Sequence, residues 1–221
     1  MSAARPAPPI RPPGAAPTAS RPGSREALLQ AASDLMIERG DVDVSLSEIG
    51  ARAGLNPALV KYYFGGRAGL MLALVQAVLA GALEQMAGLA EMDIDPVAKL
   101  RLHIKGVITV YYRYPYINRL IHALFLDPGA GEEVAKTISR PLAETQWRLV
   151  REAIDAGLVR PIDPMLFYFI ILGACDHLFF GQHVLWHAFG VRQIDDTLRR
   201  AYTDTLLEMV LQGLLVRPEQ A

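Results

Sequence analysis

Two cations and two tyrosines lie within seven positions of the chain, at Lys61, Tyr62, Tyr63 and Arg67. Ammonium and guanidinium groups bind phosphate oxygens, and a tyrosine ring combines an apolar face with a hydroxyl that forms hydrogen bonds. Small residues beside them, such as Ala58, permit another molecule to approach the backbone closely. These residue types at this spacing suit contact with the backbone and base edges of a nucleic acid.

Two short helices are expected before this group, each marked by a capping residue and a glycine. The first is predicted to begin at Ser24 and to end at Gly40, with apolar residues at helical spacing between them: Leu28, Leu29, Ala32, Leu35 and Met36. The second follows Ser45, because Ser45 and Glu48 have the spacing of a capping box. Gly54, free to adopt positive φ, ends it. Its inner face is predicted to be Leu46, Ile49, Gly50 and Ala53.

A third helix is predicted to carry Lys61 and Tyr62, with Asn56 as its N-cap and a proline in its first position. Val60 and Phe64 are four residues apart and share the inner face. The outer face holds Pro57, Ala58, Lys61 and Tyr62, with Leu59 and Tyr63 at its borders. Two short helices joined by a glycine-containing turn outline a helix-turn-helix, whose second helix enters the major groove of DNA. The alternative is an ordinary helical hairpin with a solvated lysine.

Arg67 follows Gly65-Gly66 and is predicted to open a long fourth helix. A positive charge at a helix N-terminus opposes the helix dipole. A DNA phosphate at this place would meet both the guanidinium and the free N–H groups of the first turn. The alternative is that Arg67 is simply exposed and solvated.

Residues 24–70 closely resemble the DNA-binding domain of the TetR/AcrR family of bacterial transcriptional regulators. The resemblance rests on the Ala-Ala pair and Gly40 of the first helix, the run from Ser45 to Gly54, the Tyr63-Phe64 pair and the basic residue at position 67. It implies a ligand-responsive, sequence-specific regulator, with repression as the commoner role. It also implies a homodimer formed through the last two helices, a double-stranded DNA operator and an unknown small-molecule effector as partners.

The chain departs from the family pattern at three places. The family commonly has tyrosine at position 61, a polar residue at position 59, and lysine-glutamate at positions 67 and 68. The phosphate-contacting role of that tyrosine would pass here to Lys61, together with Tyr62. We therefore expect the DNA contacts from Arg25, Ser45, Asn56, Pro57, Ala58, Leu59, Lys61, Tyr62, Tyr63 and Arg67.

Composition fits a cytoplasmic globular protein. The chain has 221 residues, 52% of them hydrophobic and 20% charged, a net charge of −1 and a single cysteine. Its first residues lack the apolar core of a signal peptide, and its longest uninterrupted apolar run, 165–175, is too short to span a membrane. We expect a disordered proline-, alanine- and arginine-rich arm over 1–23, inert or DNA-contacting, and a short tail over 217–221.

The fold class predicted is all-α, with an N-terminal three-helix helix-turn-helix domain over 24–70 and a larger helical domain for ligand binding and dimerisation over 71–216. Helices are expected at 67–89, 96–112, 116–126, 132–156, 164–180 and 195–215, with a turn at 127–129 and a kink or restart near Pro141. The helix 164–180 is apolar almost all round and needs cover on several sides, which favours a partner subunit.

The larger domain offers candidates for an apolar effector pocket. They are aromatic residues with a few polar or sulfur-containing groups, although each also suits a core or interface position. The candidates are His103, Tyr111, Tyr112, His122, Phe125, Trp147, Phe169, Cys175 and His177.

A metal or enzyme function is the alternative considered for the region from Asp176 to His187. His183 and His187 have the i, i+4 spacing of helical zinc ligands, but the glutamate of an HExxH motif and a second cysteine are lacking. No GxSxG, P-loop or GxGxxG signature occurs. We therefore predict no catalytic residue, no metal and no cofactor. The runner-up is a helical metal- or ligand-sensing protein with no DNA target.

Overall fold

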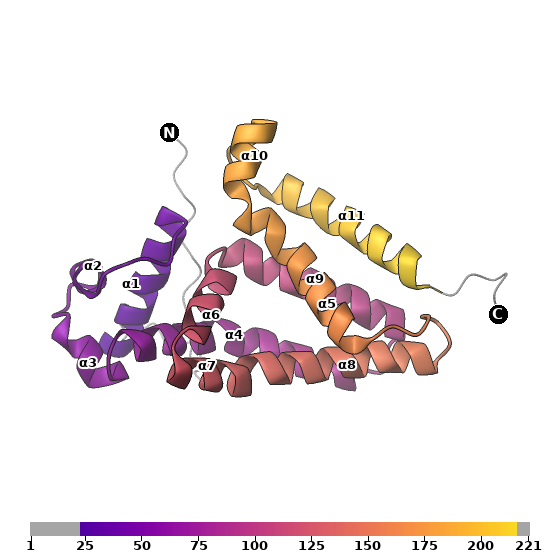
Figure 1. The fold of residues 1–221 in the computed structure, drawn as a ribbon, viewed down its shortest axis with the longest axis horizontal. Coiled ribbons are helices and arrows are strands. Elements are labelled where there is room, and N and C mark those ends of the chain that lie inside the picture. The colour runs from indigo at the N-terminus through magenta and orange to yellow at the C-terminus, as the bar shows by residue number, and fades with distance from the viewer. Residues whose placement is uncertain (1–22, 216–221) are drawn as a thin grey trace. The chain divides into compact units, whose positions relative to one another are not determined.

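The structure is a computed structural model that describes residues 23–215, and the predicted arm and tail lie almost wholly outside them (Figure 1). The described residues form helices joined by short loops. An isolated antiparallel bridge between Val159 and Leu215 is their only strand-like pairing. The predicted all-α class is confirmed. The helices are α1 Ser24–Arg39, α2 Leu46–Ala53, α3 Ala58–Phe64, α4 Arg67–Glu91, α5 Pro96–Arg113, α6 Ile117–Phe125, α7 Pro128–Val134, the π-helical turn η1 Ala135–Ser139, α8 Arg140–Asp155, α9 Pro164–Phe180, α10 Gln182–Phe189 and α11 Asp196–Leu214.

The chain divides into two compact units that are not contiguous in sequence. Unit 1 holds residues up to 82 together with 113–139, so it contains α1–α3, most of α4, α6, α7 and η1. Unit 2 holds 83–112 and the residues from 140 onward, which include the end of α4, most of α5 and α8–α11. The domain boundary predicted near residue 70 stays a prediction.

Polar interactions join α1 to α2 in unit 1. The predicted capping box is present: the Ser45 hydroxyl accepts from the Glu48 N–H at 3.2 Å, and the Glu48 carboxylate accepts from the Ser45 N–H at 2.8 Å. The Arg52 guanidinium donates to both carboxylate oxygens of Glu38, at 2.8 and 2.6 Å. Gly40 and Gly54 end α1 and α2 as predicted. The helix α1 begins at Ser24 as predicted, but Ser24 does not cap it: Gly23 holds the N-cap position, without a side-chain cap.

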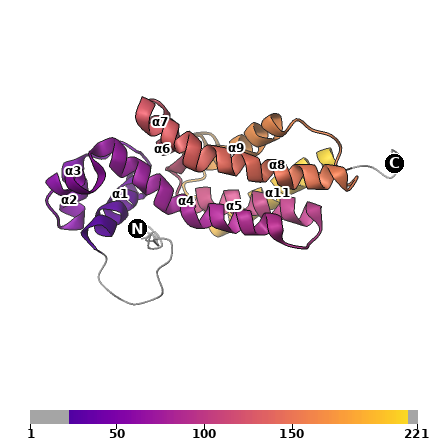
Figure 2. The ribbon, with the colours of Figure 1, turned by 90° about the horizontal axis from the view of Figure 1, so that it is seen from below.

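Two glycines permit α3 to lie close to its neighbours (Figures 1 and 2). A Cβ on Gly50 of α2 would lie 2.7 Å from Cγ of Pro57 and 2.9 Å from the carbonyl oxygen of Leu55. A Cβ on Gly69 of α4 would lie 1.8 Å from the carbonyl oxygen of Phe64. Side chains do not fit at these distances, so both positions require glycine for the observed packing.

Unit 1 also contains the segment from α6 to η1. A buried hydrogen bond of 2.7 Å joins the hydroxyls of Ser33 on α1 and Tyr116, the residue before α6. The turn predicted at 127–129 was wrong: Asp127 accepts from the Ala130 N–H at 3.0 Å and caps α7. The restart predicted near Pro141 is present as η1, because Pro141 has no N–H to continue the α-helical ladder.

Unit 2 places α5 and α8 side by side in opposite directions. Lys99 of α5 is buried, and its Nζ donates to both carboxylate oxygens of Glu152 on α8, at 2.8 and 2.9 Å. Asp163 and Asp195 cap α9 and α11 by accepting backbone N–H groups. The hydroxyl of Tyr202 on α11 donates to the carbonyl of Ala174 on α9. The helix α10, bent by 60° from α9, was not predicted.

By length and composition, α4 could cross a membrane, and the bent pair α9–α10 passes the same criterion. Polar residues such as Gln76 divide α4, so it contains no long uninterrupted apolar run. Its apolar side chains have partners in the protein, since Leu70, Leu74 and Val75 are buried in unit 1 and Met86 in unit 2. The helix α4 therefore contributes apolar side chains to both units, and 44% of its most apolar 18-residue window is buried.

Replacement of Gly50 by alanine tests the close packing of α2 and α3. We expect Gly50→Ala to lower the free energy of unfolding by about 1–3 kcal/mol, since the added methyl must displace Pro57 or the Leu55 carbonyl. Gly81→Ala is the matched control, because a Cβ there meets nothing within 4 Å and the helix gains about 0.5–1 kcal/mol. Urea denaturation followed by circular dichroism measures both. Equal effects of the two substitutions would refute the packing argument.

Candidate nucleic-acid interface

The helix α3 has one buried and one exposed face. Val60 is buried, and Phe64 is half-buried beneath the guanidinium of Arg25, which lies 5.1 Å from the ring centroid. Lys61 and Tyr62 are exposed, and 79% of Tyr62 is accessible to solvent. The predicted division is thus observed for Val60, Phe64, Lys61 and Tyr62, but it was wrong for Pro57, which is half-buried because its ring lies close to Gly50 of α2.

The start of α3 is capped by Asn56, whose side-chain oxygen accepts from the Ala58 N–H at 2.9 Å. The helix begins at Ala58, one residue later than predicted, although Pro57 already has helical dihedral angles. Ala58 is exposed, whereas Pro57 and Leu59 are half-buried. Ala58 itself carries only a methyl group, so it permits close approach of another molecule at this position.

Three further residues predicted to contact DNA interact with other residues of the protein. Arg25 is exposed, but it lies over Phe64 and 4.0 Å from the Glu26 carboxylate. The Ser45 hydroxyl is occupied by the capping box with Glu48. Tyr63 is partly exposed and makes edge-to-face contacts with the rings on either side of it, at centroid distances of 5.0 and 6.3 Å.

Arg67 opens α4 as predicted, and its guanidinium contacts the loop between α1 and α2. It donates to the carbonyl oxygen of Val44, and more weakly to that of Val42 at 3.4 Å. It also lies 3.6 Å from the carboxylate of Asp43. Arg67 therefore anchors the loop in this structure, a role that its sequence neighbourhood did not indicate. Contact with a phosphate stays a prediction.

Lys61 differs from the other cations of residues 23–70 because its side chain has no charged partner within residues 23–215. Arg39 pairs with Glu48, Arg52 with Glu38, and Arg67 with Asp43. The hydrogen bond from Arg39, then those from Ser45, hold the pKa of the Glu48 carboxyl at about 2, so this acid remains ionised and paired. Of the cations in this range, Lys61 alone has a side chain that makes no ion pair, hydrogen bond or ring contact with another described residue. Its charge is available to an external anion.

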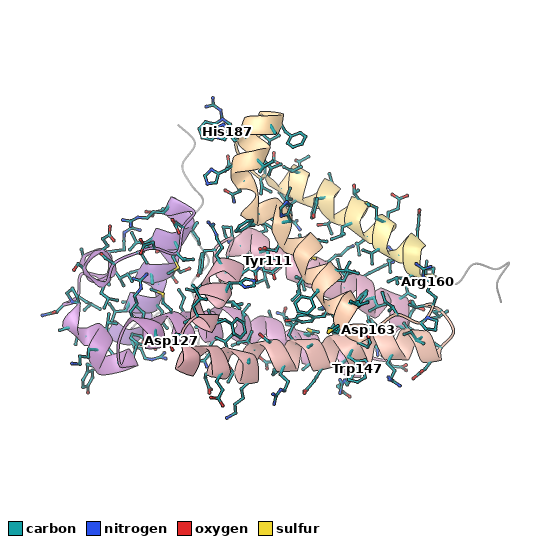
Figure 3. All side chains as sticks on the ribbon, in the orientation of Figure 1. Tyr111, Asp127, Trp147, Arg160, Asp163 and His187 are labelled. Carbon is teal, nitrogen blue, oxygen red and sulfur yellow. The ribbon has the colours of Figure 1, made fainter. Side chains whose placement is uncertain are left out.

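The nine effector-pocket candidates are not brought together. His103, Tyr111 and Cys175 are buried in unit 2, where Tyr112 is half-buried between Phe179 and Arg199. Trp147, Phe169 and His177 of the same unit are exposed, and Figure 3 shows Trp147 on the outer side of α8. His122 and Phe125 are exposed in unit 1. Burial raises the pKa of Cys175 to about 12, so its thiol stays protonated.

The sequence interpretation missed Gln146, a buried residue of α8 beside His103. A signal was present, because Leu142, Gln146, Leu149 and Ala153 follow one another at helical spacing and place the glutamine within an apolar stripe. An open groove of about 410 Å³ lies elsewhere in unit 2 and contains none of the predicted residues. It is lined by Ala87, Gly88, Glu91, Glu144, Thr145 and Arg148.

The part of the chain that the structure describes contains no cluster of side chains suited to the metal site considered as an alternative. No group of three or more His, Cys, Asp or Glu side chains within residues 23–215 is arranged to hold an ion. His183 and His187 are both exposed on α10, and the His187 ring stacks on Trp186 at a centroid distance of 4.9 Å (Figure 3).

Two family models match the chain. The model of bacterial regulatory proteins of the tetR family matches residues 28–74, and that of the tetracyclin repressor-like C-terminal domain matches residues 93–220. No curated protein sequence matches.

Solved structures similar to this chain are transcriptional regulators. FadR from Bacillus subtilis, solved in complex with stearoyl-CoA, has a TM-score of 0.66 at 17% identity, covering 85% of this chain and 97% of FadR. The fatty acid degradation regulator FadR from Bacillus halodurans has a TM-score of 0.67 at 15% identity, with coverages of 90% and 100%. A TetR/AcrR-family regulator from Thermobifida fusca has a TM-score of 0.62 at 24% identity, with coverages of 83% and 96%. At these identities the likeness shows the fold.

The anchoring role of Arg67 is testable by comparing two substitutions. We expect Arg67→Ala and Arg67→Lys both to lower the free energy of unfolding by about 1 kcal/mol. Lysine keeps the positive charge, but it lacks the planar guanidinium whose N–H groups donate to the carbonyls of Val42 and Val44. The exposed Arg101 supplies the control, where alanine should change stability by less than about 0.5 kcal/mol. Chemical denaturation measures all three. If Arg67→Lys is as stable as the wild type, Arg67 does not act through the loop.

Proposed function

Because the chain belongs to the TetR family of bacterial regulatory proteins, we propose that it represses transcription by binding an operator as a homodimer and releases it when an effector binds. It is a TetR-family transcriptional regulator, and helix-turn-helix DNA binding follows from the family. Repression needs only that the bound dimer occludes a promoter. The proposed place of action is the cytoplasm, where such an operator would lie.

The DNA-binding face is proposed to be the exposed side of α3. The observation that carries this proposal is the placement of Lys61, a cation without an internal partner beside the exposed ring of Tyr62. Lys61 would neutralise a phosphate, and Tyr62 would add hydrogen-bonding and apolar contact. Ala58 and Leu59 offer mainly apolar contacts, for example to thymine methyl groups.

Removal of the Lys61 charge tests this face. We expect Lys61→Ala to weaken binding to the DNA upstream of the gene by about tenfold, equivalent to about 1.4 kcal/mol. The slope of log affinity against log salt should become shallower by about one per reading helix, because one phosphate contact is lost. Fluorescence anisotropy over a salt series gives both quantities.

Lys105→Ala is the matched control for that experiment. Lys105 is exposed on α5 in unit 2, so the same substitution removes the same charge away from α3. Its affinity and salt slope should equal those of the wild type. If both variants lost the same DNA affinity, the change in net charge would explain the effect, and a specific role for α3 would be excluded.

The homodimer is proposed to form through α9 and α11. Apolar side chains at helical spacing on α9 are exposed in the single chain: Met165, Leu166, Phe169 and Ile170. Gly173, one turn beyond Phe169, has open space where a side chain would stand, which permits close approach of another helix. Met209 of α11 is exposed as well. A contiguous exposed apolar surface of this kind favours association with a partner subunit.

A charge placed on α9 tests this interface. We expect Phe169→Glu to give a monomer in sedimentation velocity and to bind operator DNA more weakly, because a glutamate at a residue now 66% exposed would be buried unpaired in the dimer. Leu126→Glu is the control, since Leu126 is 87% exposed in unit 1. The proposal fails if Phe169→Glu remains dimeric, or if Leu126→Glu dissociates equally.

The effector site is proposed to lie within unit 2. The FadR structure that was solved with stearoyl-CoA has a similar fold over 85% of this chain, which supports a small-molecule effector without specifying its chemistry. The buried candidates His103, Tyr111 and Cys175 all belong to this unit. Binding there would shift the dimer between two arrangements of its reading helices, with α4 as the connection.

A further inference from the structure

Two polar pairs join α5 and α8. Their members on α5, Lys99 and His103, are four residues apart, and their members on α8, Gln146 and Glu152, are six residues apart. In the first pair, the Lys99 ammonium has three acceptors: both carboxylate oxygens of Glu152 and the carbonyl of Ala90 at 3.2 Å. The second pair is His103 of α5 and Gln146 of α8. The first pair is fully satisfied by the protein, whereas the second is not.

The His103–Gln146 pair is buried without adequate partners. Only 4% of His103 and 1% of Gln146 are exposed. The imidazole Nε2 and both the nitrogen and the oxygen of the Gln146 amide have no hydrogen-bond partner. The two side chains lie near each other, but they do not meet with hydrogen-bond geometry between these atoms. Orphaned polar groups of this kind destabilise a protein, and an apolar pair of similar size would avoid that cost.

The surroundings of the pair are apolar and uncharged. Leu100 and Ile104 on α5 and Leu149 and Val150 on α8 are all buried. Burial lowers the pKa of His103 to about 4, opposed in part by Gln146, so the imidazole is neutral at physiological pH. The buried Lys99 on α5 pairs with Glu152 on α8, so its charge is compensated within the protein. A charged ligand would lose its hydration here without gaining a counter-ion.

We propose that His103 and Gln146 are the polar anchor of the effector site, and that the effector is an apolar molecule carrying an uncharged carboxamide-like group. This inference rests on the proposed effector response. The ligand N–H would donate to the Gln146 oxygen, the ligand carbonyl would accept from the Gln146 NH₂ group, and the imidazole Nε2 would hold the remaining donor or acceptor position. The anchor selects against carboxylates and ammonium ions of the same shape.

Three probes of one shape but different charge test the anchor: benzamide, benzoate and benzylammonium. The protein is the full chain with selective ¹⁵N labelling of glutamine side chains, at pH 7.5. We expect benzamide to shift the Gln146 amide signals in a saturable titration. Benzoate and benzylammonium should bind at least tenfold more weakly.

Two variants separate recognition from folding. Gln146→Met and His103→Leu each remove orphaned polar atoms and keep an apolar side chain of similar size, so their unfolding midpoints should equal or exceed that of the wild type. Each should weaken benzamide binding at least tenfold, with saturation-transfer difference measurements as the readout where the glutamine signal is lost. Gln212→Met is the control, an exposed position on α11. It should bind benzamide as the wild type does.

The outcomes are distinguishable from failure of the proposed function. If the wild type binds its operator but benzamide does not shift Gln146, or if benzoate binds equally well, the anchor is refuted while the regulator remains. If Gln146→Met folds and still binds benzamide as the wild type does, the anchor is also refuted. If the wild type binds no operator DNA, it is the proposed function that fails. The anchor is supported if the wild type binds benzamide more tightly than benzoate and benzylammonium, and if Gln146→Met and His103→Leu both lose this binding.

Discussion

The position of α3 depends on how closely its neighbours approach it. A helix of seven residues is not stable alone, so its packing must hold it in place. Val60 is its one buried side chain, and Gly50 and Gly69 permit α2 and the start of α4 to come within a distance that excludes any side chain. Because α3 is held in this way at both ends, the outward direction of Lys61 and Tyr62 is determined by backbone packing and does not depend on the flexible side chains themselves.

The same packing explains how the charges of residues 23–70 are used. Arg39, Arg52 and Arg67 are engaged with acids or carbonyls of the protein, and these contacts join α1, α2 and the first turn of α4. Lys61 remains for an external anion. A chain with a net charge of −1 can therefore present a local cation where DNA would lie, without an overall positive charge. In the interior of unit 2, by contrast, polar atoms of His103 and Gln146 are buried without a hydrogen-bond partner among the described residues.

Local signals predicted much of this arrangement from sequence. The capping box, the glycine at the end of α2 and the two faces of α3 are each determined by residues within one or two helical turns. All are observed except the outward position of Pro57, which depends on its contact with α2. The partner of Arg67 was not predictable in this way, since the carbonyl of Val44 is 23 residues distant. The aromatic pocket candidates were chosen by type, and type does not determine burial: Tyr111 is buried and Trp147 is not. Gln146 was overlooked because a glutamine usually marks the exposed face of a helix.

The most direct test of the account is whether the outer face of α3 touches DNA. A photoreactive p-benzoylphenylalanine at position 62 of the full chain, irradiated with the DNA upstream of the gene, should cross-link to that DNA in a salt-sensitive manner. The same residue at position 125, which is exposed on α6, serves as the comparison. Cross-linking from position 62 and none from position 125 is the predicted result. Cross-linking from position 125 alone would contradict the assignment of α3 as the reading helix.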